Sequence, residues 1–284
     1  MKITTTQQGL EQRITQYAPP LTESAMRATV SGGRDKEALC ARDQQRYGSG
    51  VYLPHWREVV LVVEGTDQDI DQANMNMIAT SSYHVQACRR GMTEGITPLA
   101  IGGVIRTADS RILCGIRGGV VERGKISTLP LGIMSYVDGR EPLFANFYKE
   151  LEEESGIRKK NLMTPTLVGH VTDPEFTKGL IFVMQGETTY RSKELEELHR
   201  AAFAVYKAAM SVMPEVAARK EIRRKGHINS DAWEHTRLLF IEDDPTRIKE
   251  AIAKRRIAIG DENAVLLDVA RGALLLYTEM KKSA

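Results

Sequence analysis

The chain has 284 residues, of which 42% are hydrophobic and 27% charged, and its formal net charge is +2. This length can bury a large core in one or two domains, and so small a net charge does not by itself favour a nucleic-acid or membrane partner. The three widely spaced cysteines, Cys40, Cys88 and Cys114, argue against a disulfide framework or a zinc site and favour a cytoplasmic location. No apolar run has the length of a membrane span or the form of a signal peptide.

Residues 1–95 are predicted to form an α+β extension. Residues 4–17 have the pattern of a short helix, residues 58–64 that of a buried strand, and residues 70–88 that of a second helix. We expect a second unit from residue 96 to the end of the chain.

The second unit begins with two predicted strands, at residues 96–106 and 111–116. Arg117 follows the second strand, where it is either a solvated strand end or a contact for an anion. A loop with the sequence Leu129-Pro130-Leu131-Gly132 comes next, and its glycine permits close packing of the backbone.

An acidic helix is predicted from residue 141 to residue 155. Leu143, Phe147 and Leu151 recur at four-residue steps and form its apolar stripe, and Gly156 is a natural helix stop. Three carboxylates adjoin that stripe, those of Glu150, Glu153 and Glu154. They repel one another near the end of the helix where the dipole favours cations, so a hard cation such as Mg²⁺ or Mn²⁺ would suit them. The alternative is an acidic helix face in solvent.

The spacing of this segment resembles the Nudix box, G-x5-E-x7-R-E-U-x-E-E-x-G-U, where U is a bulky aliphatic residue. The positions on pattern are Glu141, Glu150, Leu151, Glu153, Glu154, Gly156 and Ile157. Two positions depart from it, since Ser135 replaces the first glycine and Lys149 replaces the arginine. The resemblance implies an α/β fold, a Nudix-like α/β/α sandwich with a mixed sheet.

The resemblance also implies roles for side chains. Glu150, Glu153 and Glu154 would hold Mg²⁺ or Mn²⁺, with Glu150 also a candidate general base. Lys149 would orient these glutamates in place of the arginine, without its bidentate geometry, and could pair with Glu141. Substrate binding is assigned to Arg117 and Glu141. In the family, the loop before the box brings backbone groups to the metal and the diphosphate, as residues 129–132 would here.

After the box, residues 166–171 and 180–186 are predicted strands, and residues 191–227 are predicted to form a helical insertion before the last core strand. A basic cluster ends the insertion, namely Arg219, Lys220, Arg223, Arg224 and Lys225. These side chains either grip phosphates of a nucleotide or RNA or form a solvated helix end.

Glu234 precedes the last predicted strand, where Nudix proteins often place a metal ligand or general base. Glu187 and Asp231 are the alternatives to it. Residues 245–256 and 262–281 are predicted helices that close the chain.

These observations predict a Nudix-type pyrophosphohydrolase (EC 3.6.1 class). It would use a divalent metal to cleave a diphosphate bond in a small nucleotide, a nucleoside diphosphate linked to another group. Either Glu150 or Glu234 would take the proton of the attacking water. By analogy, residues 1–95 would serve homodimer formation or substrate recognition. Two alternatives stay open: a Nudix-fold nucleotide sensor without catalysis, and an RNA-end processing enzyme.

Overall fold

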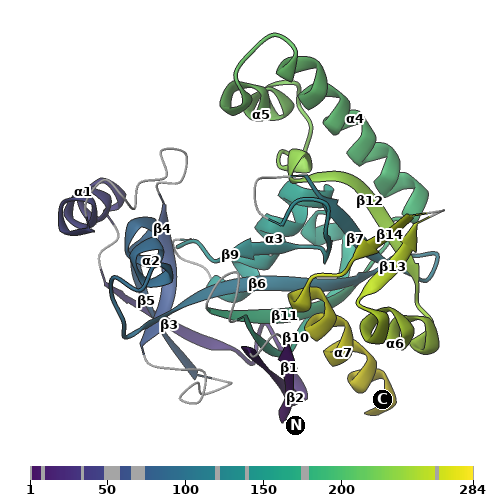
Figure 1. Cartoon of the computed structure of the whole chain (residues 1–284), viewed down its shortest axis with the longest axis horizontal. Helices are drawn as coiled ribbons and strands as arrows, with labels where there is room; N and C mark the ends of the chain where they lie inside the picture. The colour runs from purple at the N-terminus through teal and green to yellow at the C-terminus, as the bar shows by residue number, and fades with distance from the viewer. Residues whose placement is uncertain are drawn as a thin grey trace.

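The computed structural model describes residues 2–7, 10–32, 35–47, 58–64, 74–118, 122–137, 141–173, 179–259 and 262–283. A long strand, β6 (Ile96–Arg106), crosses the middle of the molecule (Figure 1). It pairs in parallel with β11 (Gly179–Thr188) and antiparallel with β4 (Val59–Glu64) and β9 (Leu131–Ile133). The sheet is therefore mixed, as predicted.

The sheet extends on both sides of β6. Beyond β11 lie β10 (Leu162–Asp173), β2 (Leu10–Thr22) and β1 (Lys2–Gln7). Beyond β4 lie β5 (Asn74–Ser81) and β3 (Arg27–Gly32). A hairpin leads from β6 to β7 (Arg111–Arg117), which pairs with β8 (Ile126–Thr128) and β12 (His235–Glu242).

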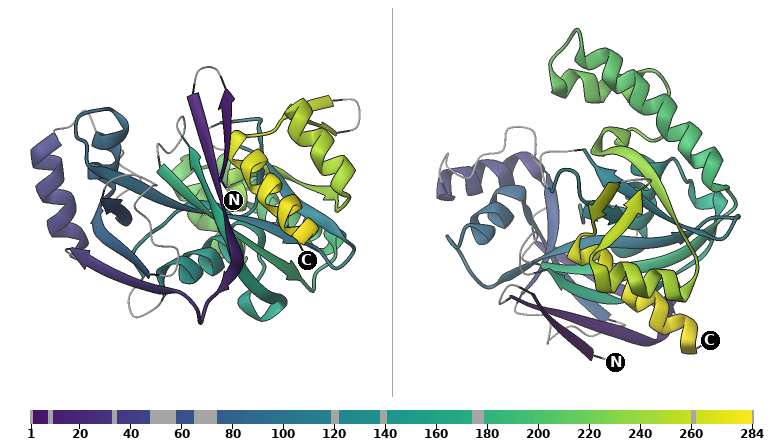
Figure 2. Two further views of the ribbon diagram at one scale, coloured as in Figure 1. Left: turned by 90° about the horizontal axis from the view of Figure 1, so that it is seen from below. Right: turned by 45° about the vertical axis from the view of Figure 1, so that its right-hand side comes forward.

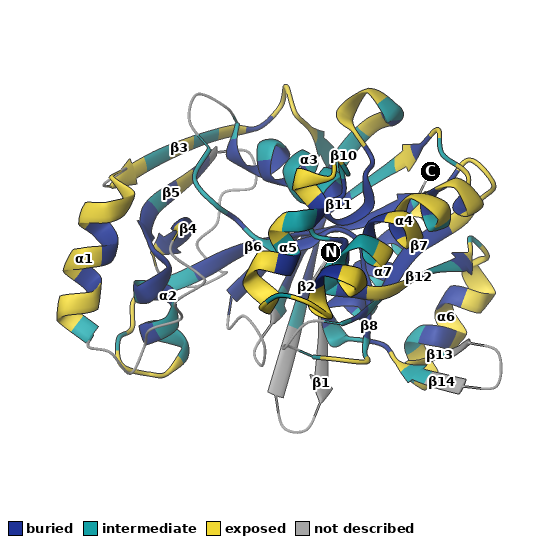
Figure 3. Cartoon of the chain, turned by 90° about the horizontal axis from the view of Figure 1, so that it is seen from above, coloured by how far each residue is buried: buried dark blue, intermediate teal, exposed yellow. Residues whose placement is uncertain are grey.

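Alternation along the central strands gives the sheet two apolar faces. On one face, Ile101 and Phe182 belong to the buried cluster that contains Phe147 of α3 (Pro142–Ser155). On the other face, Val183 belongs to the cluster that contains Leu274 of α7 (Asp268–Ser283). Figure 3 shows these central strands as buried. Helices thus cover both faces, which confirms the predicted α/β/α sandwich.

Two predictions for the extension were wrong. The described positions within residues 4–17 belong to strands β1 and β2 instead of a helix (Figure 2, left), because β2 pairs with β10, with Thr15 opposite His170. Within residues 70–88, the described part begins with β5, and only α2 (Ser82–Arg89) is helical. Met75, Met77 and Ala79 are buried on alternate positions of β5, which is the period of a strand.

The predicted strand at residues 58–64 is confirmed as β4. Helix α1 (Lys36–Tyr47), which the sequence pattern did not reveal, packs against α2 and β5. Because β4 pairs with β6 and β2 with β10, strands of the extension continue the main sheet. The division of the chain into two domains at residue 95 stays a prediction.

The predicted helical insertion is confirmed. It consists of α4 (Ser192–Met210) and α5 (Glu215–Arg224), which project at the top of Figure 1, followed by the 3₁₀ turn η4 (Ala232–Glu234) directly before β12. After β12 come α6 (Pro245–Lys254), β13 (Arg256–Ile259), β14 (Glu262–Val265) and α7. The last helix therefore begins later than predicted. A short 3₁₀ turn, η3 (Lys159–Asn161), links α3 to β10. None of the helices described is long and apolar enough to cross a membrane.

Candidate functional site

Helix α3 has local signals at both ends. The Glu141 side chain caps its start by accepting a hydrogen bond from the Phe144 N–H at 2.8 Å, and Pro142 occupies the first turn. Gly156 ends it in the left-handed conformation, with φ of 81°, which only glycine adopts without strain. Its apolar stripe is buried against the sheet, so Glu150 and Glu154 are carried to one side of that contact.

Glu154 is the most buried of the predicted metal ligands. The residue is only 1% exposed, and its Oε1 accepts a hydrogen bond from the Leu131 N–H at 3.3 Å. Its other oxygen, Oε2, is buried and has no hydrogen-bond partner among the described residues. Burial raises the pKa of this carboxyl well above its usual range, and the negative charges of Glu234 and Glu150 raise it further.

Glu150 lies against the predicted loop before the box. A Cβ atom placed on Gly132 would collide with the Glu150 carboxylate, so the bare glycine backbone leaves the room that this side chain occupies. The Glu150 side chain is 13% exposed. Burial raises its pKa to about 7 although the positive charge of Lys149 lowers it. The prediction of a loop at residues 129–132 was wrong in part, because Leu131 and Gly132 begin β9 and pair with β6. This segment touches two carboxylates, Glu150 through Gly132 and Glu154 through Leu131.

Glu234 lies on η4 and faces the glutamates of α3 from there. It ends the 3₁₀ turn η4, and its Oε2 lies 3.6 Å from Nη2 of Arg117 at the end of β7. Burial raises the pKa of Glu234 to about 7, against the opposing effect of Arg117. Asp231 and Glu150 also contribute negative charge. Glu150, Glu154 and Glu234 thus form one electrostatic cluster built from α3 and η4.

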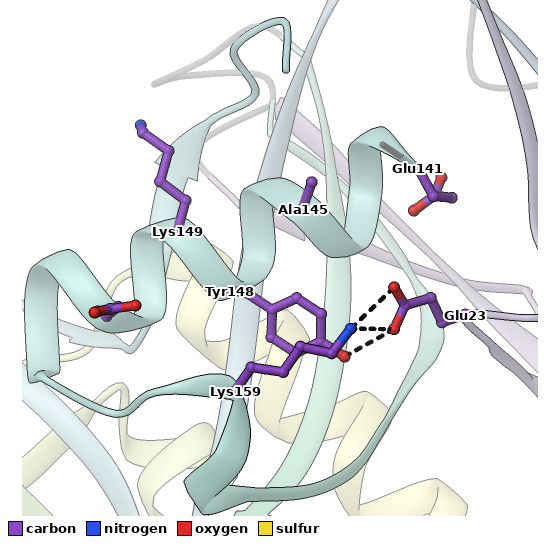
Figure 4. Close-up of a pocket in the computed structure, with 7 residues that line it drawn as sticks. Glu23, Glu141, Ala145, Tyr148, Lys149 and Lys159 are labelled. Atoms are coloured by element: carbon purple, nitrogen blue, oxygen red, sulfur yellow. Dashed lines mark hydrogen bonds and ion pairs between the residues drawn. The ribbon is translucent and has the colours of Figure 1, made fainter. Parts of the chain in front are cut away.

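Lys149 orients two of the glutamates. Its Nζ lies 2.9 Å from Oε1 of Glu150 and 3.4 Å from Oε2 of Glu153. Burial lowers the pKa of Lys149, but the two carboxylates outweigh burial and hold it above its usual value. The predicted pairing with Glu141 was wrong: Figure 4 shows the two side chains pointing apart. Eight residues of helix separate their Cα atoms by about 12 Å, whereas Glu153 lies only one turn away.

The helical insertion completes the surroundings of Glu153. The Asp231 N–H donates to the Glu153 carbonyl oxygen at 2.8 Å, and Arg223 Nη2 donates to Glu153 Oε1 at 2.9 Å. Burial and the charge of Glu153 raise the pKa of Asp231. Arg223 was predicted only as part of a basic cluster. Its contact with the box helix depends on how the insertion folds back, which no local pattern encodes.

Ser135 fits without the glycine that the Nudix pattern has at this position. Its φ is not positive, and its N–H donates to Asn146 Oδ1 at 2.8 Å while Asn146 Nδ2 donates to its carbonyl oxygen at 2.8 Å. The Ser135 hydroxyl donates to Glu58 Oε2 at 2.8 Å. The backbone at this departure from the pattern is therefore held by Asn146 of α3, and the serine side chain by Glu58 before β4.

The donor set suits a hard divalent cation. Carboxylate oxygens are the ligands that Mg²⁺ and Mn²⁺ prefer, and the partnerless buried Oε2 of Glu154 provides an oxygen that a cation would satisfy. Within the described ranges, no three His, Cys, Asp or Glu side chains already meet in the arrangement of a metal site. Glu153, which Lys149 and Arg223 contact, would have to turn to join the other two.

A separate cavity of about 710 Å³ lies on another face of α3 (Figure 4). Glu23 lines this cavity and accepts hydrogen bonds from Lys159 Nζ at 2.9 Å and from the Tyr148 hydroxyl at 3.1 Å. Tyr148 stands two residues from Glu150 and so projects from roughly the opposite side of the helix. None of the three clustered glutamates, Glu150, Glu154 and Glu234, lines this cavity, although Lys149 and Glu141 do.

Comparison with protein-family models and with curated protein sequences gives no match. Several solved structures are similar in part. They include the MutT protein from Methanosarcina mazei Go1, 12% identical with a TM-score of 0.36, covering 66% of this chain and 96% of that one. Tm1382, a candidate Nudix hydrolase, is 11% identical with a TM-score of 0.41, covering 82% and 96%. DR0079 from Deinococcus radiodurans is 11% identical with a TM-score of 0.36, covering 66% and 93%. These identities and TM-scores assign no activity to this chain.

Proposed function

We propose that this protein hydrolyses a diphosphate bond in a nucleoside diphosphate linked to another group, using a divalent cation held by Glu150, Glu153 and Glu154. The observation that carries the proposal is the buried Oε2 of Glu154, which has no hydrogen-bond partner in the described part of the chain. Leaving such a group unsatisfied costs about 1–3 kcal/mol. A cation between these carboxylates would remove that cost and their mutual repulsion.

The remaining groups have definable tasks. A bound Mg²⁺ or Mn²⁺ would neutralise phosphate oxygens and make a bound water more acidic. Lys149 keeps Glu150 and Glu153 on the same side of α3. Arg117 would contact the substrate phosphates, and its ion pair orients Glu234.

Glu234 is our proposed general base, accepting the proton of the attacking water at Oε2. A base works best when its pKa lies near the operating pH, and that of Glu234 is raised to about 7. The side chain of Glu234 is 25% exposed, against 13% for Glu150, so a water molecule reaches it more easily.

The test is a panel of diphosphate-containing nucleotides, incubated with and without Mg²⁺, with products identified by mass. Glu153→Gln and Glu154→Gln should each lower kcat by about two to four orders of magnitude without unfolding the chain. Glu152→Gln is the matched control, because Glu152 belongs to the same helix but projects elsewhere and is 43% exposed. Equal Mg²⁺-dependent turnover in all three variants would remove the assignment.

The same panel separates the hydrolase from a nucleotide sensor. The sensor is favoured by the two departures from the box, Ser135 and Lys149. If nucleotides of the panel bind but none is cleaved with any divalent cation, the hydrolase proposal is refuted and the sensor replaces it.

A further inference from the structure

A second cavity, of about 550 Å³, lies beside the carboxylate cluster. Helix α5 and the segment before β12 form it, and its lining includes four basic side chains, those of Arg219, Lys220, Arg223 and Arg224. Asp231 is the acidic residue in the described lining. The cavity is therefore basic, in contrast to the acidic cluster next to it.

Arg223 joins the two sites. Its Nη2 donates both to Glu153 Oε1, at 2.9 Å, and to the Ser230 hydroxyl oxygen, at 3.1 Å. Asp231, which also lines the basic cavity, donates its N–H to the carbonyl oxygen of Glu153. A ligand that extends from the carboxylate cluster past Arg223 would enter this cavity directly.

One basic side chain in the cavity, that of Arg219, is held in place by its neighbours. The Arg219 guanidinium lies 3.6 Å from the centre of the Trp233 ring, a cation–π contact that fixes its plane. An ion pair with Glu215 holds its Nη2. Its Nε is buried and has no hydrogen-bond partner among the residues described. A buried N–H without an acceptor is rare in folded proteins, and a ligand oxygen would satisfy it.

The chemistry of the lining favours phosphate. Guanidinium groups bind phosphate oxygens through two parallel N–H bonds, and lysine adds a point charge. Lys220 is exposed at the cavity, and Arg224, whose side chain is 68% exposed, pairs with Glu221 of the same helix. The cavity volume lies within the range of small-molecule sites, and a chain with net charge +2 does not favour a long polyanion.

We propose that this basic cavity binds a phosphate group of the substrate beyond the diphosphate that is cleaved. The substrate class is then a small nucleotide with a longer phosphate chain, or with a further phosphate on its second group. This inference rests on the proposed hydrolase function for its link to turnover, but not for binding.

Binding is tested without turnover. Inorganic tripolyphosphate is titrated into the whole chain in EDTA by calorimetry, so that no cation retains it at the carboxylates. The double variant Lys220→Ala/Arg224→Ala changes exposed side chains and should weaken binding at least tenfold. The control Lys193→Ala/Lys249→Ala removes the same charge from exposed positions elsewhere and should stay within twofold. Equal loss in both double variants, or in neither, would overturn the proposal.

Turnover then identifies the substrate class. The unmodified protein should have a higher kcat/KM for a dinucleoside tetraphosphate than for a dinucleoside diphosphate. The ratio of these two values should fall at least tenfold in Lys220→Ala/Arg224→Ala. A 5′-triphosphorylated oligoribonucleotide that binds more tightly than tripolyphosphate through the same residues would overturn the small-nucleotide class in favour of RNA. Tripolyphosphate binding without hydrolysis of any nucleotide refutes only the proposed hydrolase. Hydrolysis with the same kcat/KM ratio in Lys220→Ala/Arg224→Ala as in the unmodified protein refutes only the proposed role of the cavity.

Discussion

His199 of α4 should position Glu234 without touching it. Its buried Nε2 lies 3.1 Å from the carbonyl oxygen of Ala232 and 2.9 Å from that of His235. Both partners are acceptors, so Nε2 must carry the proton. Burial lowers the pKa of His199, and the ring is therefore neutral near pH 7. This one N–H ties down both ends of the turn that carries Glu234.

Replacing His199 by Leu removes the donor and leaves two buried carbonyl groups without it. Such a loss costs about 1–3 kcal/mol. If this cost moves Glu234 away from its working position and so raises the activation free energy by the same amount, kcat should fall by about 5- to 150-fold. The change in KM should be smaller. His199→Gln should recover most of the activity, because the glutamine Nε2 can donate from a similar position.

The assay is a double-mutant cycle on metal-dependent turnover, with unfolding in urea measured in parallel. If His199 acts through Glu234, His199→Leu should have little further effect on kcat in the Glu234→Gln background. Losses in kcat that add in full, or a glutamine variant as slow as the leucine variant, would refute this reasoning and leave His199 a purely structural residue.

Three more predictions follow from the site and its supports. Gly132→Ala should displace the Glu150 carboxylate, raising the Mg²⁺ concentration for half-maximal activity about tenfold while the urea midpoint barely changes. Lys149→Met should lower activity more than Lys149→Arg, which keeps the charge that pairs with Glu150; equal kcat/KM in the two variants would exclude an orienting charge. Asp109 accepts hydrogen bonds from the backbone N–H and the hydroxyl of Ser192. Burial raises its pKa, but these hydrogen bonds outweigh burial and lower it to about 2. Its ionised form thus stabilises the fold above pH 4, and this stability is lost as pH falls toward 2. Asp109→Asn should reduce the free energy of unfolding by about 1–2 kcal/mol at pH 7, a difference that shrinks below pH 4; a constant difference would contradict the role of the charge.

The parts of the fold that could be predicted from the sequence are those determined locally. The start of α3 at Pro142 and its end before Gly156 follow from capping residues and a helical stripe. The order of the longer elements from β6 to β12 follows from strand and helix patterns, whereas the three-residue strands β8 and β9 are too short to show one. What brings η4 against α3 is the fold of the whole insertion, so the sequence could name Glu234 but not its 3.6 Å contact with Arg117.

The errors have physical causes that can be named. Strand β2 pairs with β10, with Thr15 opposite His170 far along the chain, and β1 pairs in turn with β2. Such long-range pairing overrides local preference. The mistaken partner of Lys149 has a different, local origin. The pattern gave the spacing of Glu141, but the nearer carboxylates of Glu150 and Glu153 neutralise the lysine first.

The pairing of β2 with β10 and of β4 with β6 also bears on how such a chain could change by gene rearrangement. A shortened protein that started at residue 96 would expose backbone groups of β10 and of the first three residues of β6. Open, flat strand edges of that kind recruit strands from other molecules. Strands β2 and β4 thus cover edges of the sheet, and their loss would favour self-association of the shortened chain.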